Sequence, residues 1–409
     1  GGDGLWDRHP GQPWNNKPGN PGVSGPEKAK RPEIMSFDER YGPGAGQELS
    51  RPEVPAGSAE ADSAGKIIDA ARLQGVRRGF TTRRVQLPDQ LTLVRQSVCP
   101  QPGELALARV TSIGHHTKLE LTDGRRSQLY KGDEIIVSYA NRYAPDQFEA
   151  EVPADLEECH LVAAGGIASK LVSKNARARN PTRIQPLGLL ADLQGRPLNL
   201  SDWRIDSRSI PKPLPPVVVV AGTSMNAGKT TAAARLIRGL VRAGKRVGAA
   251  KVTGTGAGGD FWQMLDAGAA DVVDFVDAGY ASTYQLAPAE IEKVFLRLLS
   301  YLGGRGADVI VVEVADGILQ TETAALLGSP GFAYYCDRLI FAAADSMGAV
   351  AGVQWLHGKG VEVSALSGTL SGSPLAIRET STALGLPVLT KQALSEPATA
   401  LGLLNGGGF

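Results

Sequence analysis

The chain has 409 residues, enough for two or three domains, because a typical domain takes about 100–200 residues. Apolar residues make up 42% of the chain and charged residues 21%, as in an ordinary globular protein with a substantial core. The net charge of +1 argues against a dedicated nucleic-acid-binding protein, which usually carries a strongly basic face. No apolar run of about 18 residues occurs, so the sequence predicts no membrane span.

Three cysteines, Cys99, Cys159 and Cys336, lie far apart and form no CxxC pair. This spacing fits neither a disulfide framework nor a zinc site, and a reducing cytoplasm suits it best. The first residues lack the charged start and apolar run of a secretory signal. We therefore expect a cytoplasmic protein.

Residues 1–62 contain 20 glycines and prolines and offer few apolar side chains to offset the entropy of ordering the backbone. The composition therefore predicts a disordered tail. The alternative is that a few large apolar residues are short anchors for a partner protein: Trp6, Trp14, Met35 and Phe37.

Residues 63–210 are expected to form a helix followed by a β-rich domain. Apolar spacing predicts the helix over 66–76. Alternating patterns predict strands within 105–113, 118–130 and 133–140, with a hairpin turn at Thr122, Asp123 and Gly124. Short strands at this spacing indicate a small antiparallel barrel or sandwich.

Two groups of basic residues in this domain allow more than one interpretation. The first is interleaved with acids, which favours a solvated mixed surface over an oligonucleotide-binding face: Arg109, Lys118, Arg125, Arg126 and Lys131. The second could face a phosphate-bearing ligand or form a charged helix surface: Lys170, Lys174, Arg177, Arg179 and Arg183. The nearby His115, His116 and His160 are interpreted as polar contacts rather than metal ligands.

A proline-rich stretch ends at Pro216, and residues 217–409 then alternate between strand and helix patterns. The apolar, β-branched runs lie at 217–221, 245–252, 308–314, 337–343, 361–366 and 386–390. Helical stretches occur at 231–244 and 288–304. This order predicts an α/β fold, a parallel sheet covered by helices on both faces, with the ligand at the carboxyl ends of the strands.

The first of these strands is followed by a glycine-rich loop and then by the helical stretch 231–244. A strand, a loop and a helix in this order are the context of a phosphate-binding P-loop. The strict G-x-x-x-x-G-K-[ST] pattern fails at one place only, because its first glycine is Gly222 and Thr223 stands where it should be. Backbone N–H groups here can wrap phosphates at the positive end of a helix. Lys229 is expected to reach the β- and γ-phosphates, and Thr230 to ligate Mg²⁺. The full set of expected nucleotide-binding residues is Gly222, Thr223, Ser224, Met225, Asn226, Ala227, Gly228, Lys229, Thr230 and Thr231.

Two later strands end in residues that suit the same site. Glu313, with Asp316 beyond it, is expected to hold Mg²⁺ or to orient an attacking group. Lys251 begins a glycine-rich loop over 251–262, in which Asp260 is expected to complete the metal site. Thr253 and Thr255 would meet an anionic substrate or the γ-phosphate, and a flexible loop without contacts is the alternative for each of these residues.

The segment AGTSMNAGKTT resembles the P-loop of dethiobiotin synthetase, in which the first glycine also stands one residue early. The resemblance covers 217–405 at the level of motifs and marks the chain as a divergent P-loop NTPase of the SIMIBI class. It implies that Lys251 contacts substrate and phosphate and that Asp260 and Glu313 bind the metal. Homodimers are common in this class of proteins, so the resemblance also implies a homodimer. Val314 replaces a glycine of the family's V-E-G-A-G-G motif. The nucleotide-base region is similar to 362–369 and 384–389, with Ser367 or Thr369 in place of an asparagine.

Three functions follow. The first is an enzyme: Mg²⁺-dependent, ATP-dependent phosphoryl transfer or ligation on a small anionic metabolite, with Lys229, Lys251 and Glu313 as catalytic residues and GTP as the other possible donor. The second is a nucleotide-driven switch or scaffold that binds a partner protein through its N-terminal region. An NTPase acting on nucleic acid is the weakest, because the net charge is close to zero.

Overall fold

The computed structural model describes residues 66–95, 98–206 and 210–406. All of them belong to one unit, Met35–Phe409. The tail over 1–62, with the proposed anchors Trp6, Trp14, Met35 and Phe37, lies outside the described residues. No helix within the described ranges has both the length and the apolar character needed to cross a bilayer.

We call residues 66–191 the β region. Its strands are β1 (Lys66–Asp69), β2 (Arg77–Arg78), β3 (Gln90–Val94), β4 (Leu105–Ser112), β5 (Lys118–Glu120), β6 (Arg126–Gln128), β7 (Glu134–Tyr139), β8 (Arg142–Tyr143), β9 (Phe148–Glu151), β10 (Cys159–Ala163), β11 (Ile167–Lys174) and β12 (Thr182–Ala191). A short helix α2 (Ala70–Leu73) and a 3-10 turn η1 (Phe80–Thr82) complete it. A second 3-10 turn, η2 (Leu200–Trp203), follows.

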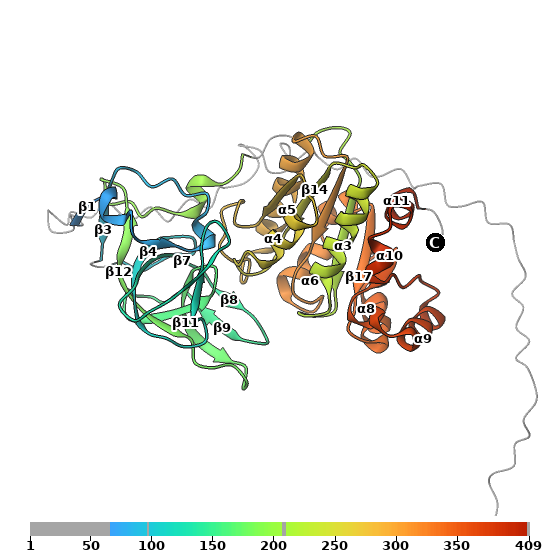
Figure 1. Ribbon diagram of the computed structural model, residues 1–409, viewed down its shortest axis with the longest axis horizontal. Helices are drawn as coiled ribbons and strands as arrows, with labels where there is room; N and C mark the ends of the chain where they lie inside the picture. The colour runs from blue at the N-terminus through green and yellow to red at the C-terminus, as the bar shows by residue number, and fades with distance from the viewer. Residues whose placement is uncertain (1–65, 96–97, 207–209, 407–409) are drawn as a thin grey trace, which may run out of the picture. The chain divides into compact units, whose positions relative to one another are not determined.

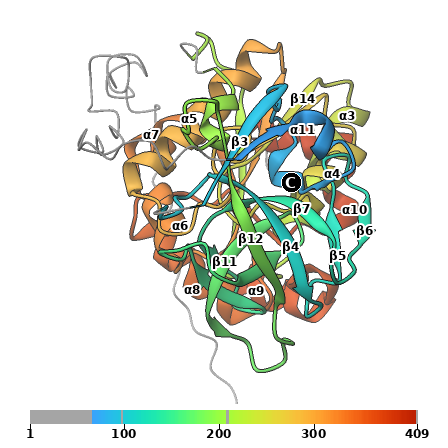
Figure 2. The ribbon, with the colours of Figure 1, turned by 90° about the vertical axis from the view of Figure 1, so that its left-hand side faces the viewer.

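Among the described residues, ten strands of the β region form one sheet. Eight of them follow the order β1-β3-β12-β4-β7-β11-β9-β8, and β10 and β2 pair with strands of this row. Strand β10 pairs with both β11 and β12, so β12, β4, β7, β11 and β10 close a ring. Of the two forms that the sequence predicts, barrel or sandwich, this is a small barrel. Figure 2 shows β4, β7, β11 and β12 together at this barrel. It is not wholly antiparallel, because β7 runs parallel to β11 and to β2.

The hairpin predicted over 118–130 is confirmed: β5 pairs with β6, and Gly124 takes a left-handed φ of 85° in the turn. The helix predicted over 66–76 is wrong in its first half. Lys66 to Asp69 form β1, paired antiparallel with β3, and only Ala70–Leu73 is helical. Strand pairing with a distant segment therefore overrides the local helical pattern.

We call residues 217–405 the α/β region. Its strands are β13 (Val217–Gly222), β14 (Val247–Lys251), β15 (Asp271–Asp274), β16 (Val309–Glu313), β17 (Arg338–Ala342) and β18 (Ala365–Ser367). Its helices are α3 (Lys229–Arg242), α4 (Gly259–Asp266), α5 (Pro288–Gly304), α6 (Thr321–Leu327), α7 (Pro330–Tyr335), α8 (Ser346–His357), α9 (Pro374–Leu384), α10 (Lys391–Leu394) and α11 (Pro397–Asn405), with a 3-10 turn η3 (Thr369–Gly372).

In the described part of the α/β region, six strands form a parallel sheet in the order β15-β14-β16-β13-β17-β18. Alternate residues of β13 enter two different cores. Val217 and Val219 pack with residues of α5 and α8, whereas Val218 and Val220 pack with residues of α3 and α11. Helices therefore cover both faces, as Figure 1 shows, and the prediction of a covered parallel sheet is confirmed.

The predicted elements of the α/β region need four corrections. The strand expected at 361–366 is only the three residues of β18, and the one expected at 386–390 is reduced to a bridge between Leu366 and Val388. The glycine-rich loop expected over 251–262 contains helix α4 from Gly259 onward. Strand β15 had no counterpart among the predicted strands.

Candidate functional site

The chain leaves β13 for α3 and then passes to β14, on the far side of β16, so the strand order reverses beside β13. A crevice at the carboxyl ends of the strands is expected at such a point. The register places Glu313 beside Val220 of β13 and beside Lys251 of β14. Side chains from three strands thus meet next to the loop that follows β13.

That loop, residues 222–230, turns sharply into α3. Asn226 and Gly228 take left-handed φ values of 64° and 98°. The Lys229 side chain folds back along the loop, and its Nζ donates to the Ser224 carbonyl at 2.8 Å. A buried ammonium donating to a loop carbonyl is held in the position where a phosphate oxygen would compete for it.

The displaced glycine has a packing reason. A Cβ on Gly222 would lie 2.6 Å from the Ala342 carbonyl and 2.9 Å from Lys229 Cγ. Glycine is therefore required at position 222, where the aliphatic part of the Lys229 side chain passes the end of β13. Gly368, which the sequence did not single out, packs as tightly, because a Cβ there would lie 2.4 Å from the Ala227 carbonyl.

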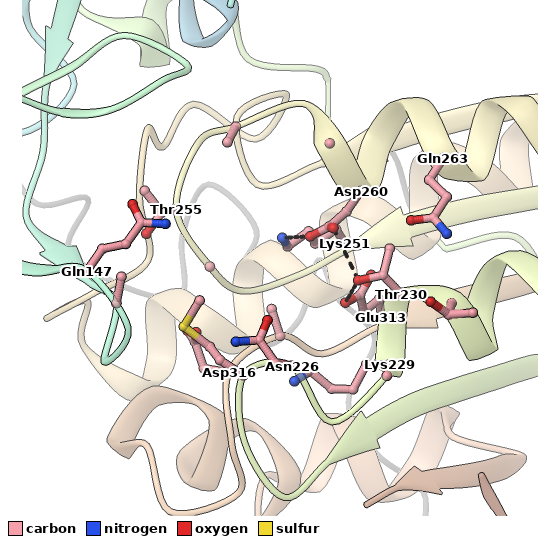
Figure 3. Close-up of a pocket in the computed structure, with 18 of the residues that line it drawn as sticks. Gln147, Asn226, Lys229, Thr230, Lys251, Thr255, Asp260, Gln263, Glu313 and Asp316 are labelled. Atoms are coloured by element: carbon pink, nitrogen blue, oxygen red, sulfur yellow. Dashed lines mark hydrogen bonds and ion pairs between the residues drawn. The ribbon is translucent and has the colours of Figure 1, made fainter. Parts of the chain in front are cut away.

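Thr230, Asp260, Glu313 and Lys251 form one cluster beside α3 (Figure 3). The Thr230 hydroxyl lies 2.8 Å from Glu313 Oε1 and 3.1 Å from Asp260 Oδ1. Lys251 Nζ forms an ion pair with Asp260. The sequence placed these four residues at one site, and they are in contact.

Burial controls the charges of this cluster. It raises the pKa of Glu313 to about 7, helped by the Asp260 charge and opposed by Lys251 and Lys229. Burial lowers the pKa of Lys229. The pKa of Lys251 is raised, because the attraction of Asp260 and Glu313 exceeds the effect of burial. Asp316, at a left-handed φ of 62°, has a pKa raised by burial.

The donor set of this cluster suits Mg²⁺. Glu313 Oε2 is buried without a hydrogen-bond partner among the described residues. Together with the Thr230 hydroxyl and Asp260 it offers hard oxygen ligands, and Mg²⁺ usually takes one or two carboxylates and completes its shell with phosphate oxygens and waters. No group of three or more His, Cys, Asp or Glu side chains arranged for a metal occurs in the described ranges.

The β region holds the start of α4. Glu120, at 1% exposure, accepts hydrogen bonds from Gly258 N and Trp262 Nε1, both at 3.0 Å. The guanidinium of Arg83 pairs with Asp274 at 2.7 Å and Asp277 at 2.6 Å. We call Glu120 and its two donors the α4 clasp. Asp260 lies between the two donors in the chain, so the position of Asp260 depends on the β region.

A single cavity of about 870 Å³ joins the two regions. The α/β region contributes Lys229, Thr230, Lys251, Asp260, Glu313 and Asp316, with Ser367, Gly368, Thr369 and Lys391. The β region contributes His115, His116, Lys118, Arg126, Arg142, Tyr143 and Gln147. The site at the phosphate loop thus has a second wall that the sequence did not predict.

Some of the other expected residues line the cavity and some do not. Met225, Asn226, Gly228 and Thr231 line the cavity, whereas Gly222, Thr223, Ser224 and Ala227 are not among its lining residues. Thr255 lines it, but Thr253 is buried and donates to the Ala315 carbonyl. Of the basic residues, Lys118 and Arg126 line it and Arg109 pairs with Glu134 instead. The second basic group lies on β11, β12 and their connection, not on a helix, and outside the lining.

No protein-family model and no curated protein matches the chain. Among solved structures, signal recognition particle 54 kDa protein from Aeropyrum pernix K1, in complex with GDP, is 20% identical with a TM-score of 0.34. The match covers 51% of this chain and spans 50% of that protein's length. Signal recognition particle receptor FtsY from Elizabethkingia anophelis is 16% identical, with a TM-score of 0.33 over 51% of this chain and 68% of that one. FtsY from Thermotoga maritima is 17% identical, with a TM-score of 0.30 over 50% and 74%. We base no functional conclusion on similarity this low.

Proposed function

We propose that the chain binds a Mg²⁺–nucleoside triphosphate at residues 222–231 and transfers its γ-phosphoryl group to a small anionic acceptor in the cavity shared with the β region. The observation that carries this proposal is the single 870 Å³ cavity containing the phosphate loop, Lys251 and a wall of β-region side chains. Ligand cavities typically have volumes of about 300–1,000 Å³, so this one, in the upper part of that range, is large enough for a nucleotide.

Each expected residue has a role in this proposal. Backbone N–H groups of the loop and the amino end of α3 hold the phosphates, and Lys229 exchanges the Ser224 carbonyl for a phosphate oxygen. Thr230, Asp260 and Glu313 hold Mg²⁺, which neutralises charge on the phosphates. ATP is the proposed donor, and GTP is the alternative that the sequence leaves open.

Lys251 is the proposed phosphoryl-transfer residue. Its ammonium is buried at 9% exposure, and it stays charged because Asp260 pairs with it. A fixed positive charge next to the metal ligands would stabilise charge that develops on the transferred group, without the cost of reorganising solvent.

A nucleotide-driven switch is the second candidate, and the α4 clasp favours it. Glu120 bonds to the first turn of the helix that carries Asp260, so a nucleotide-dependent movement of α4 would reach the β region directly. Homodimer formation and binding of a partner by the tail stay predictions.

The test is Mg²⁺-dependent binding of non-hydrolysable ATP and GTP analogues by the whole chain, followed by release of ADP or GDP. Lys245→Ala, which removes an exposed lysine near the end of α3, is the matched control for Lys229→Ala. A small metabolite that stimulates nucleotide turnover supports transfer, and stimulation by a macromolecule alone supports the switch. Nucleotide binding that is equal in Lys229→Ala and Lys245→Ala would remove both candidates.

A further inference from the structure

Arg142 is a buried cation that the proposed function does not use. It lies on β8 at 6% exposure, in the β-region wall of the cavity. One guanidinium nitrogen, Nη2, donates to Gln147 Oε1 at 2.8 Å. The other two, Nε and Nη1, are buried and make no hydrogen bond within the described chain.

The guanidinium also has no counter-ion among the residues that the structure describes. No described carboxylate lies within ion-pair distance of Arg142, and the acidic charges that act on it are Asp146 and Asp316. Its other close neighbour is the Phe148 ring, whose centroid is 5.7 Å from Cζ. A buried charge with unpaired donors destabilises a fold, so its presence beside a cavity points to a ligand that supplies the missing acceptors.

The groups around Arg142 define the charge of that ligand. His116 lines the same wall, and its Nδ1 is buried without a partner among the described residues. Burial, and then the charge of Arg142, lower the pKa of His116 to about 3, so this ring is neutral at pH 7. His115 beside it also has a pKa lowered by burial. Arg142 is the buried cation next to these two imidazoles, and the planar fork of its guanidinium matches a single carboxylate group.

This wall is close to the phosphate loop. The β8–β9 hairpin reaches that loop at its tip, where Asn226 Nδ2 donates to Asp146 Oδ2 at 3.5 Å. Tyr143 follows Arg142 in β8 and feels the charge of Asp316, which lies just beyond β16. An anion bound to Arg142 would therefore lie in the same cavity as Lys251 (Figure 3 shows Gln147 on this side).

We propose that Arg142, with Gln147 and His116, is the acceptor subsite of the cavity and binds a carboxylate of the small molecule that receives the phosphoryl group. This inference rests on the proposed function for the fate of the acceptor. Carboxylate binding at Arg142 can be measured without nucleotide turnover.

The test uses the whole chain and a series of unbranched monocarboxylates and dicarboxylates, from formate to adipate. The binding of each acid is compared with that of its neutral amide. Isothermal titration calorimetry is run with Mg²⁺ and a non-hydrolysable ATP analogue, and again without nucleotide. We expect at least one carboxylate to bind and its amide to bind at least about tenfold more weakly, because charge-assisted hydrogen bonds are lost. Arg142→Gln should weaken carboxylate binding by at least about tenfold and leave nucleotide affinity unchanged.

Two further variants complete the design. Arg177→Gln removes an exposed arginine outside the cavity and should bind carboxylates as the wild type does. Arg142→Lys keeps the charge without the planar fork and should show intermediate affinity, which supplies a second variant if Arg142→Gln does not fold.

Four results would overturn the inference. They are no carboxylate binding to the wild type, equal binding of acids and amides, unchanged carboxylate affinity in both Arg142 variants, and methyl phosphate binding more tightly than every carboxylate. Weaker nucleotide binding in Arg142→Gln, with carboxylate binding intact, would assign Arg142 to the nucleotide and overturn it as well. Carboxylate binding by a chain that binds no nucleotide would contradict the proposed function and leave the subsite standing.

Discussion

Replacing Glu313 by glutamine should stabilise the protein in the absence of Mg²⁺ and remove a ligand of the proposed metal site. Glu313 is 1% exposed, and burial beside Asp260 raises its pKa to about 7 from an ordinary 4.5. A carboxyl whose pKa is higher in the folded state than in the unfolded state stabilises folding below pH 4.5. That stabilisation is lost as the pH rises through about 7. Glutamine resembles the protonated acid at every pH.

The size of the effect follows from the pKa difference. A displacement from 4.5 to about 7 corresponds to about 3 kcal/mol between the protonated and ionised forms. Glu313→Gln should therefore unfold with nearly the wild-type free energy near pH 4.5. At pH 8 the variant should be more stable by up to about 3 kcal/mol. The Thr230 hydroxyl can still donate to the amide oxygen, so the local hydrogen bond survives.

Urea denaturation followed by tryptophan fluorescence, at both pH values and with EDTA present, measures this difference. Glu157→Gln, at an exposed carboxyl, is the control and should differ little from wild type at either pH. Adding Mg²⁺ and nucleotide should then reverse the order, because only the wild type keeps both carboxylates of the proposed metal site. A Glu313→Gln variant that is less stable than wild type at pH 8 in EDTA would show that Lys229 and Lys251 compensate the buried charge, and would refute the reasoning.

Three further substitutions test the site. Lys229→Ala should abolish measurable nucleotide binding, because it removes the ammonium held over the loop; binding within a factor of about two of wild type in an equilibrium titration would contradict this role. Lys251→Ala should spare nucleotide binding and lower single-turnover phosphoryl transfer by about 100-fold or more, whereas a loss of affinity alone would count against transfer. Glu120→Gln keeps the shape of the α4 clasp and removes its charge; we expect weaker Mg²⁺ affinity at unchanged Mg²⁺-free nucleotide affinity, and the idea fails if both constants match wild type.

The sequence predicted the part of the site that strand order controls. A buried strand that runs into a glycine-rich loop and a helix leaves little choice of geometry, so the placement of Lys229 and Thr230 followed directly. Lys251 and Glu313 were recognised as strand ends, and the parallel register of β14 and β16 makes them neighbours. Such residues can be predicted because their positions depend on local patterns and on a regular sheet.

The rest of the cavity depends on contacts that no local pattern encodes. Glu120 is one of the acids interleaved with the first basic group, which the sequence assigned to a solvated mixed surface. Its hydrogen-bond donors are 138 and 142 residues away in the chain. Arg142 lies in a two-residue strand and carries no motif. Helix α4 follows a glycine-rich stretch and is held by aromatic packing of Phe261 and Trp262 on Phe80 of the β region. A buried cation can be recognised as a binding site only when the structure shows that its hydrogen-bond donors have no partner.

These contacts make the metal cluster a joint property of the two regions. A Cβ on Gly165 of the β region would lie 2.1 Å from the Gly256 carbonyl. The backbones of these two segments are therefore in direct contact. Two residues later, Gly258 is held by Glu120, and Asp260 follows. Any displacement of the β region would therefore move a proposed Mg²⁺ ligand and Arg142 together. An acceptor bound at Arg142 and a cation bound at Asp260 would therefore be positioned by the same contacts between the two regions.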